Sequence, residues 1–252
     1  MIAGFLSLGL FLVSSVLAVP TDISKAPQWS QEAIQKVEDA KIMSGFGDGS
    51  FRPNEFLNRA EAVTILTRLK KVDLSTAKSV NKFSDVPQDS WFSPAVWAAT
   101  TRGWLMGFPD RKFRPEQNLN RAEWAVLLTR AFELSGDKKT QTGSGCTDVM
   151  EGDWFYASVS ALAANGIVRR DYATDFGPSE IVTRAEAAWQ IAEILDMPRL
   201  MGTSKTNEFT GAKRSDARRV AIKPRNFKRG NFAMACANGE SSANDTPLLP
   251  VS

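Results

Sequence analysis

Apolar residues recur at helical spacing in three similar segments of the chain, and each segment is led by a tryptophan. In the first, Ile34 and Val37 follow Trp29 with charged residues between them, which is the pattern of a helix with one buried face. The same pattern follows Trp91 and Trp154. Glycines and a proline then interrupt the apolar spacing over about twelve residues, which indicates an ordered loop. We therefore expect three helices, each followed by a loop.

A second helix is predicted after each loop, because the same start signal recurs there. An Asn or Thr is followed three positions later by Glu, which is the pattern of a capping box that satisfies free amides of the first turn. The three boxes are Asn58 to Glu61, Asn120 to Glu123 and Thr183 to Glu186. One helical hairpin of this size cannot bury its apolar face alone, whereas three packed together can.

The three segments are copies of one unit. Placing their leading tryptophans in register aligns 33 residues without a gap, with a period of 62 or 63 residues. A Phe and a Pro keep their offsets in every loop, at Phe51, Phe113 and Phe176 and at Pro53, Pro115 and Pro178. We expect the repeated Phe to fill the core beneath its loop.

These repeats resemble S-layer homology domains. The resemblance is carried by the tryptophan-led helix, by loops of the type Gly-Phe-x-Asp-Gly-x-Phe-x-Pro and by the Asn/Thr-Arg-Ala-Glu helix start, and it covers residues 21–196. Asp-Val also precedes the second and third tryptophans by six residues, whereas Asp22 in the first copy fits only with one extra residue. The resemblance implies repeats at residues 21–70, 83–132 and 146–196.

The same resemblance implies an all-α fold, in which three helix-loop-helix repeats form a pseudo-threefold spindle with grooves between neighbouring repeats. Members of the family bind cell-wall glycopolymers, which often bear pyruvate ketals, and thereby anchor exported proteins to the bacterial envelope or S-layer. The implied partner of this chain is thus a cell-wall polysaccharide, which can be pyruvylated.

An arginine opens the second helix of every repeat, and the resemblance assigns ligand contact to these residues, Arg59, Arg121 and Arg184. A helix start gathers free amides and the positive end of the helix dipole, and a guanidinium can bind a carboxylate through two hydrogen bonds. An acid group on a sugar would suit this arrangement. The structural alternative is that each arginine binds a carboxylate of a neighbouring repeat and holds the spindle together.

Further candidates for glycan binding come from the helix starts and the loops. Aromatic rings can pack on the C–H faces of sugars, although a tryptophan at a repeat start more often belongs to the core. Carboxylates can accept hydrogen bonds from hydroxyls, and glycines shape the loops. The candidates are Trp29, Trp91, Trp154, Asp85, Asp148, Asp110, Gly45 and Gly107.

The loop of the third copy departs from the other two. It carries Arg169, Arg170 and Ala173 around the positions where the first two copies have glycine and aspartate. We expect the groove beside this loop to bind more weakly or with a different specificity. Among the three arginines, the sequence therefore favours Arg59 and Arg121 as ligand contacts.

Composition narrows the chemistry further. The 252 residues contain no histidine and only two cysteines. The lack of histidine excludes histidine-based catalysis and histidine metal ligands. No metal and no cofactor are predicted. Glu61 and Glu123 are taken up as helix caps, and no segment outside the repeats is long enough for a catalytic domain, so we expect a non-catalytic protein. The main alternative to glycan binding is a helical-repeat scaffold for protein interaction on the cell surface.

The two ends of the chain differ from the repeats. Residues 1–18 are apolar and uncharged, and they end in small residues, which predicts a signal peptide cleaved after Ala18 and a location in the cell wall or on the envelope surface. An uncleaved membrane anchor is the alternative. An exported chain can also form a disulfide between Cys146 and Cys236, and the sequence leaves this pairing open.

Residues 199–252 form a basic segment with little apolar periodicity, which we expect to be disordered. Residues 199–230 hold ten Lys or Arg residues against two acids. For an exported protein, anionic wall polymer or lipid headgroups fit this charge better than nucleic acid does. A solvated tail without a partner is the alternative.

Overall fold

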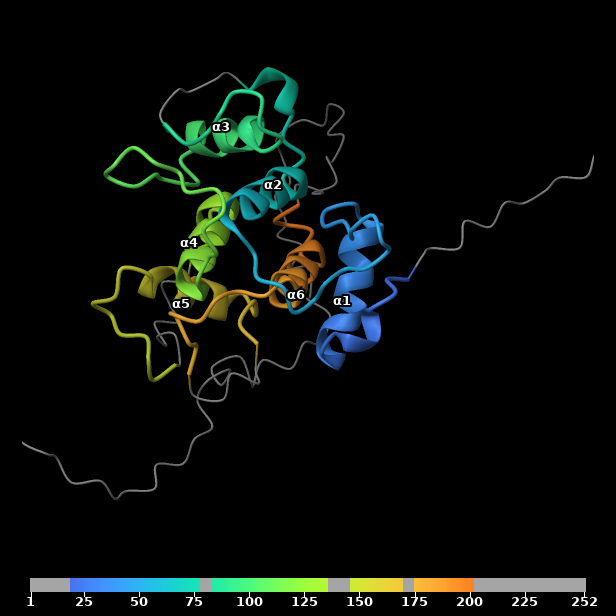
Figure 1. Ribbon diagram of the computed structural model, residues 1–252. Helices are drawn as coiled ribbons and strands as arrows, with labels where there is room; N and C mark the ends of the chain where they lie inside the picture. The colour runs from blue at the N-terminus through green and yellow to red at the C-terminus, as the bar shows by residue number, and fades with distance from the viewer. Residues whose placement is uncertain (1–18, 78–82, 136–145, 170–174, 202–252) are drawn as a thin grey trace, which may run out of the picture.

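The computed structural model describes residues 19–77, 83–135, 146–169 and 175–201, and the described part is all-α, as predicted. Its six α-helices are α1 (Gln28–Asp39), α2 (Arg59–Leu69), α3 (Ser93–Thr101), α4 (Arg121–Phe132), α5 (Tyr156–Ala164) and α6 (Arg184–Leu195), with short 3-10 helices at Ile23–Lys25 and Leu74–Thr76 (Figure 1). The predicted signal peptide, nearly all of the predicted basic tail, and Cys236 lie outside the described residues.

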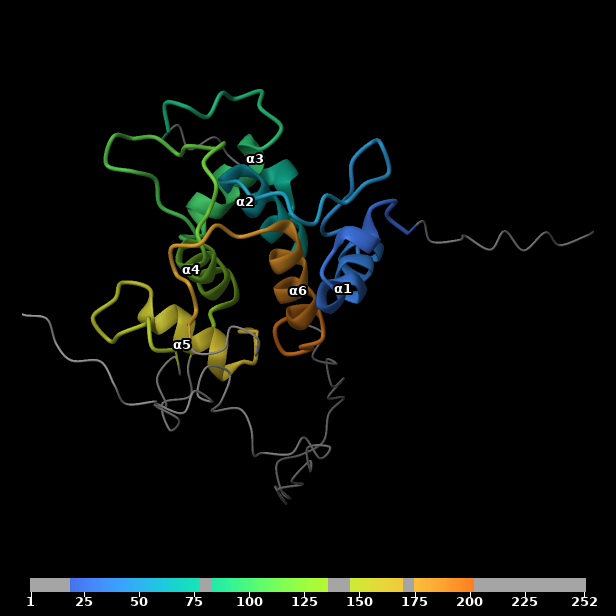
Figure 2. The ribbon, with the colours of Figure 1, turned by 60° about the horizontal axis from the view of Figure 1, so that its bottom comes forward.

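Each repeat supplies two helices that are packed mainly on the helices of its neighbours. The second helix of a repeat packs on the first helix of the next repeat, so α2 contacts α3 and α4 contacts α5. The ring closes where α6 of the last repeat packs on α1 of the first, and the two helices lie side by side in both ribbon views (Figures 1 and 2). An ion pair between Lys36 and Asp196 joins the same two repeats.

The helix starts follow the capping pattern. The Asn58 side chain accepts a hydrogen bond from the amide of Glu61 at 2.9 Å, and the Glu61 carboxylate in turn accepts one from the Asn58 amide at 3.1 Å. Equivalent boxes open α4 and α6. Because these caps satisfy the first-turn amides, they fix the point at which each second helix begins.

The three loops meet at the centre of the ring. The amide of Leu57 donates to the carbonyl of Val182, that of Val182 to Leu119, and that of Leu119 back to Leu57, at 2.9 to 3.0 Å. This closed circuit of hydrogen bonds ties together one residue from each repeat. The loop phenylalanines Phe51, Phe113 and Phe176 are at most 1% exposed and fill the core, as predicted.

Candidate functional site

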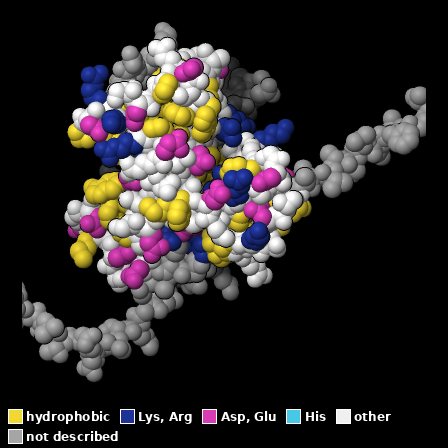
Figure 3. Space-filling model, in the orientation of Figure 1, with side chains coloured by type: hydrophobic (Ala, Val, Ile, Leu, Met, Phe, Trp, Pro, Cys, Tyr) yellow, Lys and Arg dark blue, Asp and Glu magenta, His cyan; other side chains and the backbone are white. Residues whose placement is uncertain are grey.

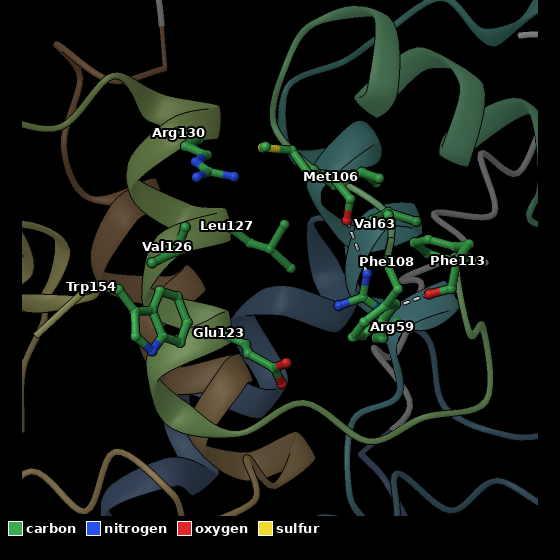
Figure 4. Close-up of a pocket in the computed structure, with 12 residues that line it drawn as sticks. Arg59, Val63, Met106, Phe108, Phe113, Glu123, Val126, Leu127, Arg130 and Trp154 are labelled. Atoms are coloured by element: carbon green, nitrogen blue, oxygen red, sulfur yellow. Dashed lines mark hydrogen bonds between the residues drawn. The ribbon is translucent and has the colours of Figure 1, made fainter. Parts of the chain in front are cut away.

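A groove opens between repeats 1 and 2, beside the start of α2, and we call it the Arg59 groove. Its volume is about 220 Å³ (Figure 4). It is lined by Arg59 and Val63 of α2, by Leu105, Met106, Gly107, Phe108 and Phe113 of the second loop, by Glu123, Val126, Leu127 and Arg130 of α4, and by Trp154.

A second groove is the symmetry equivalent of the first, between repeats 3 and 1, and we call it the Arg184 groove. It has a volume of about 120 Å³. Its lining residues are Met43, Ser44, Glu61, Thr64, Ile65, Arg68, Trp91 and Arg184. Ser44 and Thr64 stand where the Arg59 groove has Met106 and Val126, and the second groove has the smaller volume.

Arg59 lies at the floor of its groove and is bound to the neighbouring repeat. Its Nε donates to the carbonyl of Phe113 at 2.8 Å, and its Nη2 donates to the carbonyl of Met106 at 3.4 Å. The guanidinium also lies 4.9 Å from the centroid of the Phe108 ring. Only 8% of the residue is exposed. Burial lowers the pKa of the guanidinium, because its lowering effect exceeds the raising effect of the negative charge of Glu123.

Arg184 repeats this geometry at the start of α6. Its Nε donates to the carbonyl of Phe51 at 2.9 Å and its Nη2 to the carbonyl of Ser44 at 3.0 Å, while 5% of the residue is exposed. Burial again lowers the pKa of the guanidinium. Each helix-start arginine therefore reaches across to the loop of the next repeat, and α6 of the third repeat reaches to the loop of the first.

Arg121 contacts acids as well as the loop. Its guanidinium lies 2.6 Å from the Glu186 carboxylate and 3.0 Å from that of Glu180, and its Nη1 donates to the carbonyl of Phe176 at 3.1 Å. This is the contact with a neighbouring carboxylate that the structural interpretation of the arginines predicts. Arg59 and Arg184 form no such ion pair among the described residues, because Glu123 and Glu61 stand further away.

The third junction also has a pocket, of about 520 Å³, whose lining includes Trp29, Arg121 and Glu186, and the divergent loop alters this junction further. The guanidinium of Arg169 lies 3.1 Å from the centre of the Trp29 ring and is 8% exposed, so it covers the tryptophan face that is open in the other two grooves. Because each arginine reaches to the next repeat, this junction belongs to Arg121. The groove that resembles the Arg59 groove is therefore that of Arg184, which the sequence analysis did not favour.

The tryptophans at the repeat starts are not core residues. Trp91 is 63% exposed and Trp154 is 66% exposed, and each packs edge-on against the following phenylalanine, so the core interpretation is wrong for both. The physical reason is that Phe92, which is buried, occupies the core position beside Trp91. Trp29 is half-buried, with Arg169 over its ring.

The candidate aspartates bind backbone or neighbouring side chains of the loops. Asp85 accepts hydrogen bonds from the amides of Phe113 and Arg114 at 2.8 and 2.7 Å, and Asp148 accepts the equivalent pair from the third loop at 2.8 Å. Asp22 does the same in the first repeat despite its extra residue. Asp110 accepts from Arg114, which lowers the pKa of its carboxyl group. None of these aspartates lines either groove.

The candidate glycines lie where a side chain would collide. A Cβ atom on Gly107 would stand 2.1 Å from the Phe83 ring and 2.9 Å from the carbonyl of Lys112. On Gly45 it would stand 2.7 Å from the carbonyl of Ser50. Of the two, only Gly107 also lines a groove.

Two groove arginines escaped the sequence analysis. Arg68 and Arg130 line the Arg184 and Arg59 grooves from the last turns of α2 and α4, respectively. The signal was present, because each follows the repeated Arg of its own helix by nine positions, where the third copy has Glu193. Within the described residues there is no group of three or more Cys, Asp or Glu side chains that could hold a metal ion.

Taken with the fold, these sites define a class of protein in which helix-loop-helix repeats close into a ring and leave grooves at their junctions. The chain belongs to the S-layer homology domain family, whose model matches residues 21–63, 82–125 and 147–188. No helix in the described ranges has the length and apolar character needed to cross a bilayer.

Similar proteins occur in several bacteria. The chain is 31% identical over 170 residues to the Surface-layer 125 kDa protein of Lysinibacillus sphaericus, covering 66% of this chain and 14% of that protein. It is 29% identical over 177 residues to the Cellulosome-anchoring protein of Acetivibrio thermocellus (69% and 39% covered) and 28% identical over 184 residues to an uncharacterized cell wall amidase of Bacillus anthracis (71% and 33%). The chain thus spans well under half the length of each of these relatives.

Proposed function

We propose that this chain is a non-catalytic wall-binding module, which anchors or associates an exported protein with the bacterial envelope by binding an acid-bearing saccharide of the cell wall. The observation that carries the proposal is the pair of symmetry-related grooves. Each is flanked by an exposed tryptophan and carries two arginines against one glutamate. The names of the similar proteins, which include surface-layer and anchoring proteins, support the same function.

The chemistry of the grooves suits a carbohydrate acid. The exposed faces of Trp91 and Trp154 can pack against the C–H surface of a sugar ring, and carboxylates such as Glu123 can accept hydrogen bonds from its hydroxyl groups. The excess of positive charge favours an anionic substituent. A pyruvate ketal fits this description, because it places one carboxylate and one methyl group on an otherwise neutral sugar.

Two binding grooves on one small domain also suit attachment to a polymer. Once one groove holds a repeating unit of the chain, the second binds another unit at a high effective concentration, so that modest single-site affinities give strong retention. An anchor on a wall polysaccharide requires this kind of retention. The third junction, where Arg169 covers Trp29 and Arg121 is paired with acids, is excluded from the proposal.

The test is sedimentation with purified wall polysaccharide from a bacterium that carries an S-layer. We expect the wild type to co-sediment, and Trp91→Ala with Trp154→Ala to lower the affinity at least about tenfold, since aromatic contacts of this kind dominate small interfaces. Because both side chains are mostly exposed, the melting temperature should change little.

The matched control is Trp29→Ala, which removes the equivalent side chain at the third junction. It should leave polysaccharide binding at the level of the wild type, even if it lowers stability. Retention of full binding by the variant that lacks Trp91 and Trp154 would contradict the proposal, as would release of cleaved glycan from the polysaccharide.

A further inference from the structure

The helix-start arginines of the two grooves donate hydrogen bonds to the neighbouring loops. Arg59 and Arg184 each donate through Nε and Nη2 to two loop carbonyls, and both are more than nine-tenths buried. Their guanidinium planes are fixed by these bonds and by the phenylalanine rings beside them. Such side chains hold the groove loops in place with two of their five N–H donors, and less than a tenth of each residue is exposed.

Arg130 and Arg68 stand in the opposite situation. Each is exposed and lines its groove, and neither takes part in an ion pair within the described part of the chain. In Figure 4 the guanidinium of Arg130 extends from α4 across the groove toward Met106, on the side away from Glu123. An open guanidinium at the wall of an apolar groove is well placed to bind a carboxylate with two hydrogen bonds.

We propose that Arg130 in the Arg59 groove and Arg68 in the Arg184 groove bind the acid group of the wall saccharide. The inference rests on the proposed function and specifies which residues recognise the charge. The helix-start arginines then shape the two grooves by holding their loops, and they add positive potential beneath the ligand.

The layout of α4 gives the bound saccharide a direction. Glu123 and Arg130 are seven residues apart, which corresponds to about two turns or roughly 10 Å along the helix axis. Val126 and Leu127 lie between them, with the exposed side chain of Met106 across the groove and Trp154 at its edge. A sugar unit of this length would present hydroxyls to Glu123, its apolar face to the tryptophan, and its acid group to Arg130.

The third repeat supports the assignment by contrast. Where the first two repeats have Arg68 and Arg130, the third has Glu193. Glu193 is half-buried, and burial, together with the nearby Asp196, raises the pKa of its carboxyl group. A glutamate at this position offers no guanidinium to a ligand carboxylate. The position thus carries an arginine in the two open grooves and an acid at the junction where Arg169 covers the tryptophan.

The experiment compares two forms of purified wall polysaccharide, the native polymer and the polymer whose carboxyl groups have been reduced to alcohols. We expect the wild type to bind the native form about tenfold or more tightly, which is the effect of a charged hydrogen bond. The double variant Arg68→Gln with Arg130→Gln should bind both forms equally, with the weaker affinity and an unchanged melting temperature.

Arg102→Gln is the matched control, because Arg102 is an exposed arginine at the end of α3 that lines neither groove. It should discriminate between the two polymers as the wild type does. The inference is wrong if the double variant still prefers the native polymer, or if the wild type binds both forms equally well. Failure of the wild type to bind either form would instead refute the proposed function itself.

Discussion

The guanidinium of Arg121 lies 2.6 Å from the carboxylate of Glu186, and this ion pair joins repeats 2 and 3 at a junction whose two counterparts carry open grooves. Both side chains are largely buried, with exposures of 16% and 8%. The equivalent residues in the Arg59 groove, Arg59 and Glu123, form no ion pair among the described residues. One repeat sequence thus supports an ion pair between these two positions at one junction and none at another.

This difference predicts unequal effects of the same substitution. Glu186→Gln should lower the free energy of unfolding by about 2 kcal/mol, because it leaves the buried Arg121 charge with a weaker partner. Glu123→Gln should cost less than about 1 kcal/mol. Both glutamates belong to capping boxes, so the loss at the cap cancels in the comparison. Chemical denaturation of the two variants measures the difference, and equal losses would show that the ion pair adds nothing.

Asp85 should be essential for the Arg59 groove although it does not line it. Asp85→Ala removes the acceptor of two loop amides, at Phe113 and Arg114, and we expect a loss of about 2 to 3 kcal/mol of stability. Asp89→Ala is the control, since Asp89 is exposed and its side chain makes no hydrogen bond to any residue in the described ranges. Hydrogen exchange should show faster exchange in the second loop only for the Asp85 variant. Equal protection in both would contradict the assigned role.

The close surroundings of Gly107 predict that a side chain at this position destabilises the fold, and a second glycine variant serves as the control. Gly107→Ala places a Cβ atom 2.1 Å from the Phe83 ring, so the ring or the loop has to move, and we expect a destabilisation of about 1 to 3 kcal/mol. Gly47→Ala has no atom within 4 Å of the new Cβ and should leave stability nearly unchanged. Thermal melts of both variants provide the measurement. A Gly107→Ala protein as stable as the wild type would mean that this contact is easily relieved.

Much of this architecture follows from the sequence, because its determinants are local. The capping boxes and the loop phenylalanines are recognised from residues that are close in the sequence, so their pattern predicts the helix starts and the core positions. The offset of one repeat between Arg184 and the loop it holds is set by packing between repeats, and no local pattern records it. No local pattern records that Trp91 lies on the surface while Phe92 is buried in the core. Nor does one record that the guanidinium of Arg169 covers the ring of Trp29.

Acid should loosen the first loop at an unusually low pH. Hydrogen bonds from Ser50 and Arg52 lower the pKa of Asp48 from 3.8 to about 2. Because the folded-state pKa lies below the unfolded value, the stabilisation is fully present above about pH 4 and is lost as the pH falls through about 2. An NMR titration of the Asp48 carboxyl carbon should give the low value, and Ser50→Ala should raise it. A midpoint near 3.8 in the wild type would show that these hydrogen bonds do not persist in solution.

Closure of the ring predicts that the repeats do not fold one by one. In the intact protein α1 packs on α6, and Arg184 holds the first loop through Phe51 and Ser44. A chain that ends at residue 135 loses all of these contacts, which leaves the apolar face of α1 in water. We expect it to show less than two thirds of the helical circular dichroism of the wild type and a broad thermal transition. Addition of the missing repeat as a separate peptide, residues 146–201, should restore helicity, because the peptide supplies α6. A sharp transition in the shortened chain alone would instead show that two repeats suffice for a stable fold and that closure through α1 and α6 is not required.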